Sequence, residues 1–190
     1  MFAMIRSALV MLALMTVLTG LVYPLLVTGV AQVVFPQRAN GSLIERDGKV
    51  IGSELIGQAF EGARYFWSRP SATSPFPYNA GASNSSNLGP TNPALLDAVK
   101  ERVEKLRQAH PDQSGPVPAD LVTTSASGLD PHISPAAAYY QAGRVAKARS
   151  LDVERVRALI AEHTESRLLG VWSEPRVNVL RLNLALDAIK

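Results

Sequence analysis

Two patterns of hydrophobic and polar residues divide the chain, and they meet near Phe35. Ser7 to Gln37 contains no charged side chain, and most of its positions are Leu, Val, Ala or Met. A helix rises about 1.5 Å per residue, so about 20 apolar residues cross the hydrocarbon core of a membrane. The pattern therefore predicts a short tail over residues 1–6, a transmembrane helix over 7–35 and an extramembrane domain over 36–190.

The apolar run could instead belong to a secretory signal peptide, because Gly29-Val30-Ala31 presents small residues as at a cleavage site. The apolar part of a signal peptide usually has only about 7–15 residues. The run here is much longer. We therefore expect a retained, single-pass anchor in the lipid bilayer.

Small, polar or helix-distorting residues recur at every fourth position of this helix: Thr16, Gly20, Pro24, Thr28 and Gln32. Close backbone approach and interhelical hydrogen bonds drive helix association in a bilayer, so this ridge predicts a face for a partner helix. Gly and Pro are also common in transmembrane helices that have no such role. Pro24 has no N–H for the carbonyl of Gly20, which predicts a local kink.

The extramembrane domain shows four candidate strand regions. Ser42 to Ile51 reads as a hairpin around Asp47-Gly48, a pair suited to a type I′ turn. The aromatic residues of Ala63 to Trp67 favour a strand. Leu121 to Thr124 predicts another strand, and Val177 to Leu182 alternates as a strand does.

Cap signals predict the helices of this domain. Asn92-Pro93 opens a helix to Ala109 that includes Glu101 and Lys105 as an i,i+4 ion pair, and Ser134-Pro135 opens one to Arg149. Asp152 caps a helix to His163, and Asn183 caps a last turn from Leu184 to Ile189. Strands and helices mix without a βαβ rhythm, which indicates an α+β domain. The long irregular stretch Ser68 to Asn92 is typical of a functional or flexible loop.

Composition and charge narrow the function classes. The 190 residues include no Cys, which excludes a disulfide framework, a thiolate nucleophile and a Cys-based zinc site. The net charge is +3, but every charged residue except Arg6 lies from Arg38 onward, where both signs are interspersed. Nucleic acid is therefore not an expected partner. The bases Arg6 and Arg38, Arg46 and Lys49 flank both ends of the helix, so their count does not decide its orientation.

The residue types of a serine hydrolase occur together in Ser125, Ser127, Asp130 and His132. The local sequence lacks the first glycine of a G-x-S-x-G elbow, so no strained turn exposes a nucleophile. We therefore favour a hydrogen-bonded turn closed by Asp130-Pro131. A membrane-anchored extracytoplasmic serine hydrolase remains the alternative.

Other chemistry-bearing patterns are weaker. Gly52 and Gly57 have the glycine spacing of a phosphate loop, but Gln58-Ala59 replaces its Lys-Ser/Thr, so Gly57 is expected to be a turn residue. His110, His132 and His163 show no ligand spacing, and no metal site is expected. The densest basic region is interpreted as two solvated helix faces, with anionic lipid headgroups or an acidic partner patch as the alternative; it consists of Arg144, Lys147, Arg149, Arg155 and Arg157.

Several ordered stretches resemble the C subunit of the Kdp-type potassium-transporting ATPase (KdpC family) over nearly the whole chain. They are Tyr23 to Leu25, Ala39 to Ile44, Gly52 to Gln58, Tyr65 to Ala72, Ser86 to Pro90, Asp120 to Asp130, Arg144 to Arg149 and Val177 to Asp187. Gln141-Ala142-Gly143 departs from the family pattern, in which we expect a bulkier residue and proline.

The resemblance implies a non-catalytic accessory subunit of an ATP-driven, high-affinity potassium uptake complex in a bacterial inner membrane. Its partners would be a channel-like potassium subunit and a P-type ATPase subunit. The family is described as a catalytic chaperone that raises the ATPase subunit's affinity for ATP, and its proposed nucleotide contact falls on Gln58.

ATP is cytoplasmic, so direct contact with it conflicts with an extracytoplasmic domain, which is the placement we expect. An outside domain would instead suit a cap over the potassium entrance. The sequence alone does not decide between the chaperone that contacts ATP and the cap over the potassium entrance.

Overall fold

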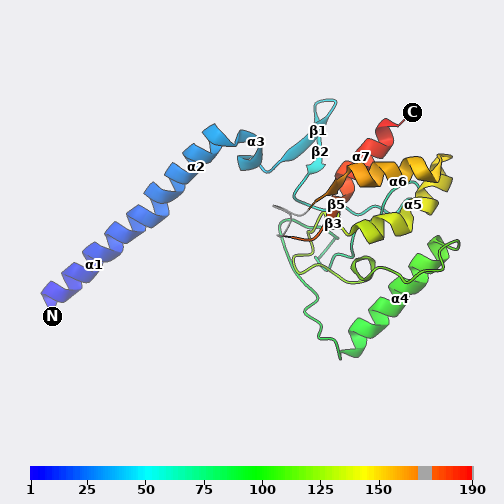
Figure 1. Cartoon of the computed structure of the whole chain (residues 1–190). Helices are drawn as coiled ribbons and strands as arrows, with labels where there is room; N and C mark the ends of the chain where they lie inside the picture. The colour runs from blue at the N-terminus through cyan, green and yellow to red at the C-terminus, as the bar shows by residue number, and fades with distance from the viewer. Residues whose placement is uncertain (167–172, 190) are drawn as a thin grey trace. The chain divides into compact units, whose positions relative to one another are not determined.

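The computed structural model describes residues 1–166 and 173–189. The chain forms two compact units, Met1–Ile51 and Gly52–Lys190. Figure 1 shows the first unit as a long helix followed by a hairpin, and the second as helices around a small sheet. The α+β class and the single apolar helix are confirmed.

The apolar helix runs from Phe2 to Val34, which is 33 residues, and contains an 18-residue window with a mean hydropathy of 2.2, so it is long and apolar enough to cross a membrane. It consists of α1 (Phe2–Val17), a π-helical turn (Leu18–Val22) and α2 (Tyr23–Val34). The helix begins at Phe2 and so includes most of the tail expected over residues 1–6. The short helix α3 (Pro36–Ala39) follows it.

A π-helical turn lies just before Pro24, where the sequence predicts a local kink. The N–H of Tyr23 bonds to the carbonyl of Leu18, five residues back, one turn before the proline. Widening the helix here redistributes backbone hydrogen bonds around a residue that has no N–H to donate.

The predicted hairpin is confirmed as β1 (Leu43–Arg46) and β2 (Lys49–Ser53), which pair as a two-stranded sheet. Asp47 and Gly48 have φ of 53° and 73°, the two positive values that a type I′ turn requires.

The second unit is built on a three-stranded antiparallel sheet in the order β3–β5–β4. The strands are β3 (His132–Ile133), β4 (Thr164–Glu165) and β5 (Arg176–Asn178), with Ile133 and Thr164 both opposite Val177. The helices are α4 (Pro93–Ala109), a 3-10 turn (Ala119–Leu121), α5 (Pro135–Arg149), α6 (Val153–Glu162) and α7 (Val179–Ala188).

The predicted caps explain where three of these helices begin. The side chain of Asn92 accepts a hydrogen bond from the N–H of Ala94, that of Ser134 from Ala137, and that of Asp152 from Glu154. Each removes one unsatisfied donor from the first turn. The core lies between α5, α6, α7 and the sheet, and its fully buried side chains include Ile133, Val145, Val156, Ile160, Val177, Leu182 and Leu186.

Two strand predictions were wrong in this unit, and a third strand was predicted too long. Ala63 to Trp67 is irregular and not a strand. Leu121 ends a 3-10 turn and residues 122–124 are irregular, with the hydroxyl of Thr123 donating to the carbonyl of Ala119. The final strand stops at Asn178, because the side chain of Asn178 accepts from the N–H of Arg181 and opens α7 there.

The capping residue of the last helix was thus Asn178 and not Asn183, which lies inside α7 with only 2% of its surface exposed. On α4, the expected ion pair between Glu101 and Lys105 is absent among the described residues. Asp97 and Lys100 pair there instead, at 3.8 Å.

Candidate functional site

Two amides replace the missing partner strand of residues 63–67. Asn183 in α7 accepts from the N–H of Phe66 at 2.8 Å and donates to its carbonyl at 3.0 Å. Gln141 in α5 does the same for Trp67, at 2.7 and 3.1 Å. A primary amide offers the donor and acceptor that a strand backbone would offer. Both amides are essentially buried, and their hydrogen bonds hold the aromatic segment against α5 and α7.

Arg144 fastens the first part of the same segment. Its guanidinium donates to the carbonyls of Gly62, Ala63 and Tyr65, and to the side-chain oxygen of Gln141. It also lies over the Trp67 ring, with its carbon 4.3 Å from the ring centroid. No carboxylate pairs with it in the described part of the chain, and burial lowers the pKa of Arg144 to about 10.

Arg149 also holds this segment, so the basic residues of α5 are not all solvated, although the sequence predicts that they are. Its side chain is only 8% exposed, donates to the carbonyl of Arg64 and pairs with Asp187 at 2.6 Å. Lys147 and Arg157 do lie in solvent, in exposed pairs with Asp112 and Glu154. Arg144 and Arg149 are therefore structural, while the exposed bases remain available to a partner.

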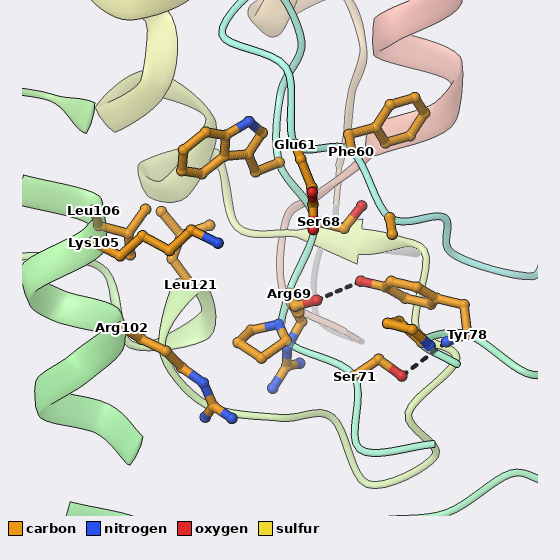
Figure 2. A pocket seen from close by; sticks show the side chains of 14 residues that line it. Phe60, Glu61, Ser68, Arg69, Ser71, Tyr78, Arg102, Lys105, Leu106 and Leu121 are labelled. Atoms are coloured by element: carbon orange, nitrogen blue, oxygen red, sulfur yellow. Dashed lines mark hydrogen bonds between the residues drawn. The ribbon is translucent and has the colours of Figure 1, made fainter. Parts of the chain in front are cut away.

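Trp67, at the end of the fixed aromatic segment, lines a cavity of about 240 Å³, and residues of α4 line its opposite wall. Figure 2 shows Arg102, Lys105 and Leu106 projecting from α4 toward this cavity, with Phe60 and Glu61 at its other side. Its full lining is Ala59, Phe60, Glu61, Trp67 to Ser71, Pro77, Tyr78, Arg102, Lys105, Leu106 and Leu121. We call it the α4 pocket.

The α4 pocket combines an apolar floor with cationic groups. Leu106 and Leu121 are buried, and Trp67 stands beside them. Arg102 donates to the carbonyl of Val122 at 2.9 Å, which fixes its side chain but leaves its charge unneutralised by any carboxylate among the described residues. Lys105 is exposed and has no ion pair in the described ranges. The pocket thus suits a group that is apolar and carries a negative charge.

Arg69 and Tyr78 hold the far wall of the α4 pocket. The Tyr78 hydroxyl donates to the carbonyl of Arg69, and its backbone N–H donates to the hydroxyl of Ser71 (Figure 2). Burial raises the pKa of Tyr78 to about 12, so this phenol stays protonated and keeps its donor. Arg69 pairs with Asp130 at 3.1 Å and is therefore a neutralised part of the wall.

Gln58 lines a second cavity of about 290 Å³ that shares Ala59, Pro77 and Tyr78 with the α4 pocket. Gly57 is buried here after the turn at residues 53–56, and a Cβ on it would lie 2.8 Å from the carbonyl of Asp130. Gly57 is therefore required by close packing rather than by a turn of its own. The other lining residues are Gly52, Ser53 and Ile56, and no cationic side chain among the described residues lines this cavity.

The candidate hydrolase residues form the expected turn. Ser125 accepts from the N–H of Gly128 at 3.0 Å, and Ser127 from that of Leu129 at 3.1 Å. Asp130 accepts from the backbone and the ring Nδ1 of His132. Neither serine hydroxyl bonds to His132 within the described structure, so the fold brings together an acid and a histidine without a nucleophile.

Asp130 is held ionised by its neighbours. Burial raises its pKa, but the hydrogen bonds from His132 and the charge of Arg69 outweigh burial, and the pKa lies below the ordinary 3.8. The three histidines are not brought together, and no group of three or more metal-ligand residues occurs in the part of the chain that is described. His110 is instead buried beside Arg144 and Trp67.

The predicted partner-helix face lies on the apolar helix of the first unit. Thr16, Gly20, Pro24 and Thr28 are all exposed, and a Cβ built on Gly20 would meet nothing within 4 Å. Gln32 is different, because its amide exchanges two hydrogen bonds with that of Asn40, at 3.1 and 3.3 Å. Residues four apart drift by about 40° per step around an α-helix, and the π-helical turn at Leu18–Val22 changes this angle locally.

Sequence reasoning missed the residues that organise the α4 pocket, although a signal for them existed. Gln141 and Asn183 are polar residues within otherwise apolar helix faces: Gln141 lies next to Tyr140 and Ala142, and Asn183 between Leu182 and Leu184. Buried polar side chains in such positions need specific partners.

Comparison with known proteins gives one consistent result. Residues 5–188 match the family described as KdpC: K+-transporting ATPase, c chain. A potassium-transporting ATPase KdpC subunit of Methylococcus capsulatus is 63% identical over 97% of both chains. The KdpC subunit of Polaromonas naphthalenivorans is 63% identical over 98% of this chain and 95% of its own, and that of Sorangium cellulosum is 60% identical over 100% of both.

Proposed function

The chain belongs to the KdpC family of potassium-transporting ATPase subunits, and on this premise we propose that it is a non-catalytic accessory subunit of an ATP-driven potassium uptake complex. The observation that carries the proposal is the match over residues 5–188, which includes both the apolar helix and the second unit. Its partners would be a channel-like potassium subunit and a P-type ATPase subunit.

The exposed ridge of the apolar helix supports a role in assembly. Thr16, Gly20, Pro24 and Thr28 would gain little from facing lipid, whereas a partner helix can pack closely against them. The occupied hydroxyls of Ser125 and Ser127 give no support to the hydrolase alternative. Co-purification tests the assembly role: detergent extraction of a tagged chain should recover both partner subunits, and a cell lacking the chain should fail to grow at low potassium.

Within this role we propose an inner-membrane orientation with the second unit outside the cytoplasm, where it would cap the potassium-entry side. Long domains cross the membrane largely regardless of flanking charge, which permits this orientation. Lys49 is exposed and the chain has no Cys, so Lys49→Cys should react with a membrane-impermeant thiol reagent on spheroplasts. Phe2→Cys, at the other end of the helix, should react only after lysis. The reverse pattern would place the domain in the cytoplasm.

The family's chaperone role is the second candidate, in which the subunit promotes ATP binding by the ATPase subunit through Gln58. Its support is the cavity that Gln58 lines. Against it stands the lack of a cation in that lining, because triphosphate binding normally uses Lys, Arg or a nest of backbone N–H groups. We therefore favour the cap, which must act on transport through differential contacts in two states of the complex.

A further inference from the structure

We propose that the α4 pocket receives a single large apolar side chain, adjacent to a carboxylate, from an extramembrane segment of a partner subunit. This proposal rests on the proposed function, because it requires a partner complex. It assigns the contact to one face of the second unit, between α4 and residues 59–71.

The size of the pocket favours a side-chain anchor. Its volume of about 240 Å³ lies below the roughly 300–1,000 Å³ of sites that enclose drug-sized molecules and cofactors. A cavity of this size accommodates one aromatic or large aliphatic side chain. Leu106, Leu121 and Trp67 supply an apolar floor for it, and such desolvated pockets are where interface binding energy concentrates.

The charges at the pocket specify the neighbour of that side chain. Arg102 and Lys105 lie three residues apart on α4 and both face the cavity (Figure 2). Neither is paired with a carboxylate among the residues described, while Arg69 is already neutralised by Asp130. Glu61 contributes one negative charge at the opposite side. The cationic edge is therefore along α4, and a carboxylate of the partner would be attracted there.

The wall that carries Trp67 is rigid before any partner binds. Gln141 holds both backbone groups of Trp67, and Arg144 lies over its ring. A preformed wall reduces the entropy that binding must offset. The α4 pocket is therefore a preformed binding pocket, and its Trp67 wall does not have to change conformation when a partner binds.

Site-specific photo-cross-linking in the assembled complex tests the proposal. Ala59 is exposed and lines the pocket, so p-benzoylphenylalanine at this position places the probe at its mouth. The same amino acid at exposed Ala80, which is not in the lining, is the control. We expect position 59 alone to cross-link one partner segment that contains a large apolar residue beside Asp or Glu.

Charge reversal then tests the specificity. Lys105→Glu should reduce the cross-link yield about tenfold, whereas Lys100→Glu, on the same helix but outside the pocket, should not. Replacing the cross-linked segment's carboxylate with Lys should restore the yield in the Lys105→Glu complex. A merely structural effect of Lys105→Glu would not be rescued in this way.

The outcomes separate the two proposals. Cross-links at position 59 only to lipid, to this chain itself or to a segment without a carboxylate would overturn the docking proposal, even though co-purified partners would leave the subunit role standing. Failure of the unsubstituted chain to co-purify with any partner would overturn both.

Discussion

The Nε–H of Arg144 donates to Nε2 of His110 at 2.9 Å, and this bond fixes the protonation state of the histidine. Nδ1 of His110 lies 2.7 Å from the carbonyl of Leu106, which can only accept, so Nδ1 carries the ring hydrogen and Nε2 is bare. A second proton on His110 would point directly at the donor of Arg144. The two residues are therefore compatible only while the imidazole is neutral.

This geometry predicts a pH-dependent stability. Burial lowers the pKa of His110 below 6.5, and the charge of Arg144 lowers it further against the opposing bond to Leu106. The unfolded chain then binds the extra proton more readily than the folded chain does. The free energy of unfolding should therefore keep its full value above about pH 6.5 and fall as the pH decreases below it.

Thermal unfolding of the full chain in detergent between pH 8 and pH 5 would measure this effect. His110→Gln should lower the Tm at pH 8, because a buried donor loses its partner, but should flatten the pH dependence across pH 6.5. His163→Gln, at the end of α6, is the matched control and should keep the pH dependence of the Tm. An unchanged pH profile in His110→Gln would contradict the neutral assignment.

Gln141→Leu should destabilise the second unit by about 2–4 kcal/mol, because the N–H and carbonyl of Trp67 would both lose their partner in a buried setting. Denaturant unfolding of the full chain in detergent would measure the change. Gln108→Leu, at an exposed position of α4, should stay within about 0.5 kcal/mol. Equal stability of the two variants would show that the amide does not replace a strand.

Gly20→Leu should weaken assembly of the complex without destabilising the isolated chain. A Cβ built on Gly20 meets nothing within 4 Å in this chain, so we expect the loss of binding to come from a clash with a partner helix. Recovery of partner subunits in a pull-down measures the effect, and Leu14→Ile on another face serves as the control. Full recovery with Gly20→Leu would remove the argument for a packing ridge.

Gln58→Ala should change the ATP dependence of the complex by less than about twofold, and the chain alone should bind ATP no tighter than about 1 mM. A neutral amide in a cavity without cations attracts triphosphate charge weakly. Calorimetry on the chain and ATPase assays on the complex would measure both. A micromolar dissociation constant that disappears in Gln58→Ala would instead favour the chaperone role.

Ser127→Ala should cost about 1 kcal/mol of stability, the value of one side-chain to backbone hydrogen bond, and leave potassium-dependent growth intact. His132→Ala should act in the same way, through its bonds to Asp130. Catalytic triad members behave as a unit whose loss costs orders of magnitude in rate. Loss of transport in a normally assembled complex of either variant would revive a catalytic reading of this turn.

Local signals predicted the parts of the fold that depend on neighbouring residues. The caps Asn92, Ser134 and Asp152 bond N–H groups two or three positions away, and Asp47-Gly48 needs only its own backbone angles. These elements could be predicted from the sequence because the interactions that fix them join residues only a few positions apart.

Elements whose partners are distant could not be read in this way. The strand propensity of Tyr65 to Trp67 was real, but the groups that satisfy its backbone are side chains of α5 and α7. Lys105 belongs by spacing to a pair with Glu101, yet in the fold it faces the α4 pocket. The polar residues Gln141 and Asn183 on apolar helix faces indicated specific partners, but the pocket exists only after the long-range contacts form, so its place could not be predicted.

The replacement of a partner strand by two amides also sets an order of events during folding. Phe66 and Asn183 are 117 positions apart, and Trp67 and Gln141 are 74 apart. Contacts of such sequence separation form late, after the intervening chain has been organised. Trp67 and the carbonyl of Tyr65 can bond once α5 has formed, whereas the backbone of Phe66 stays unpaired until α7 has docked. A chain shortened before α7 would therefore leave the N–H and the carbonyl of Phe66 without their partner, although α5 could still hold Trp67.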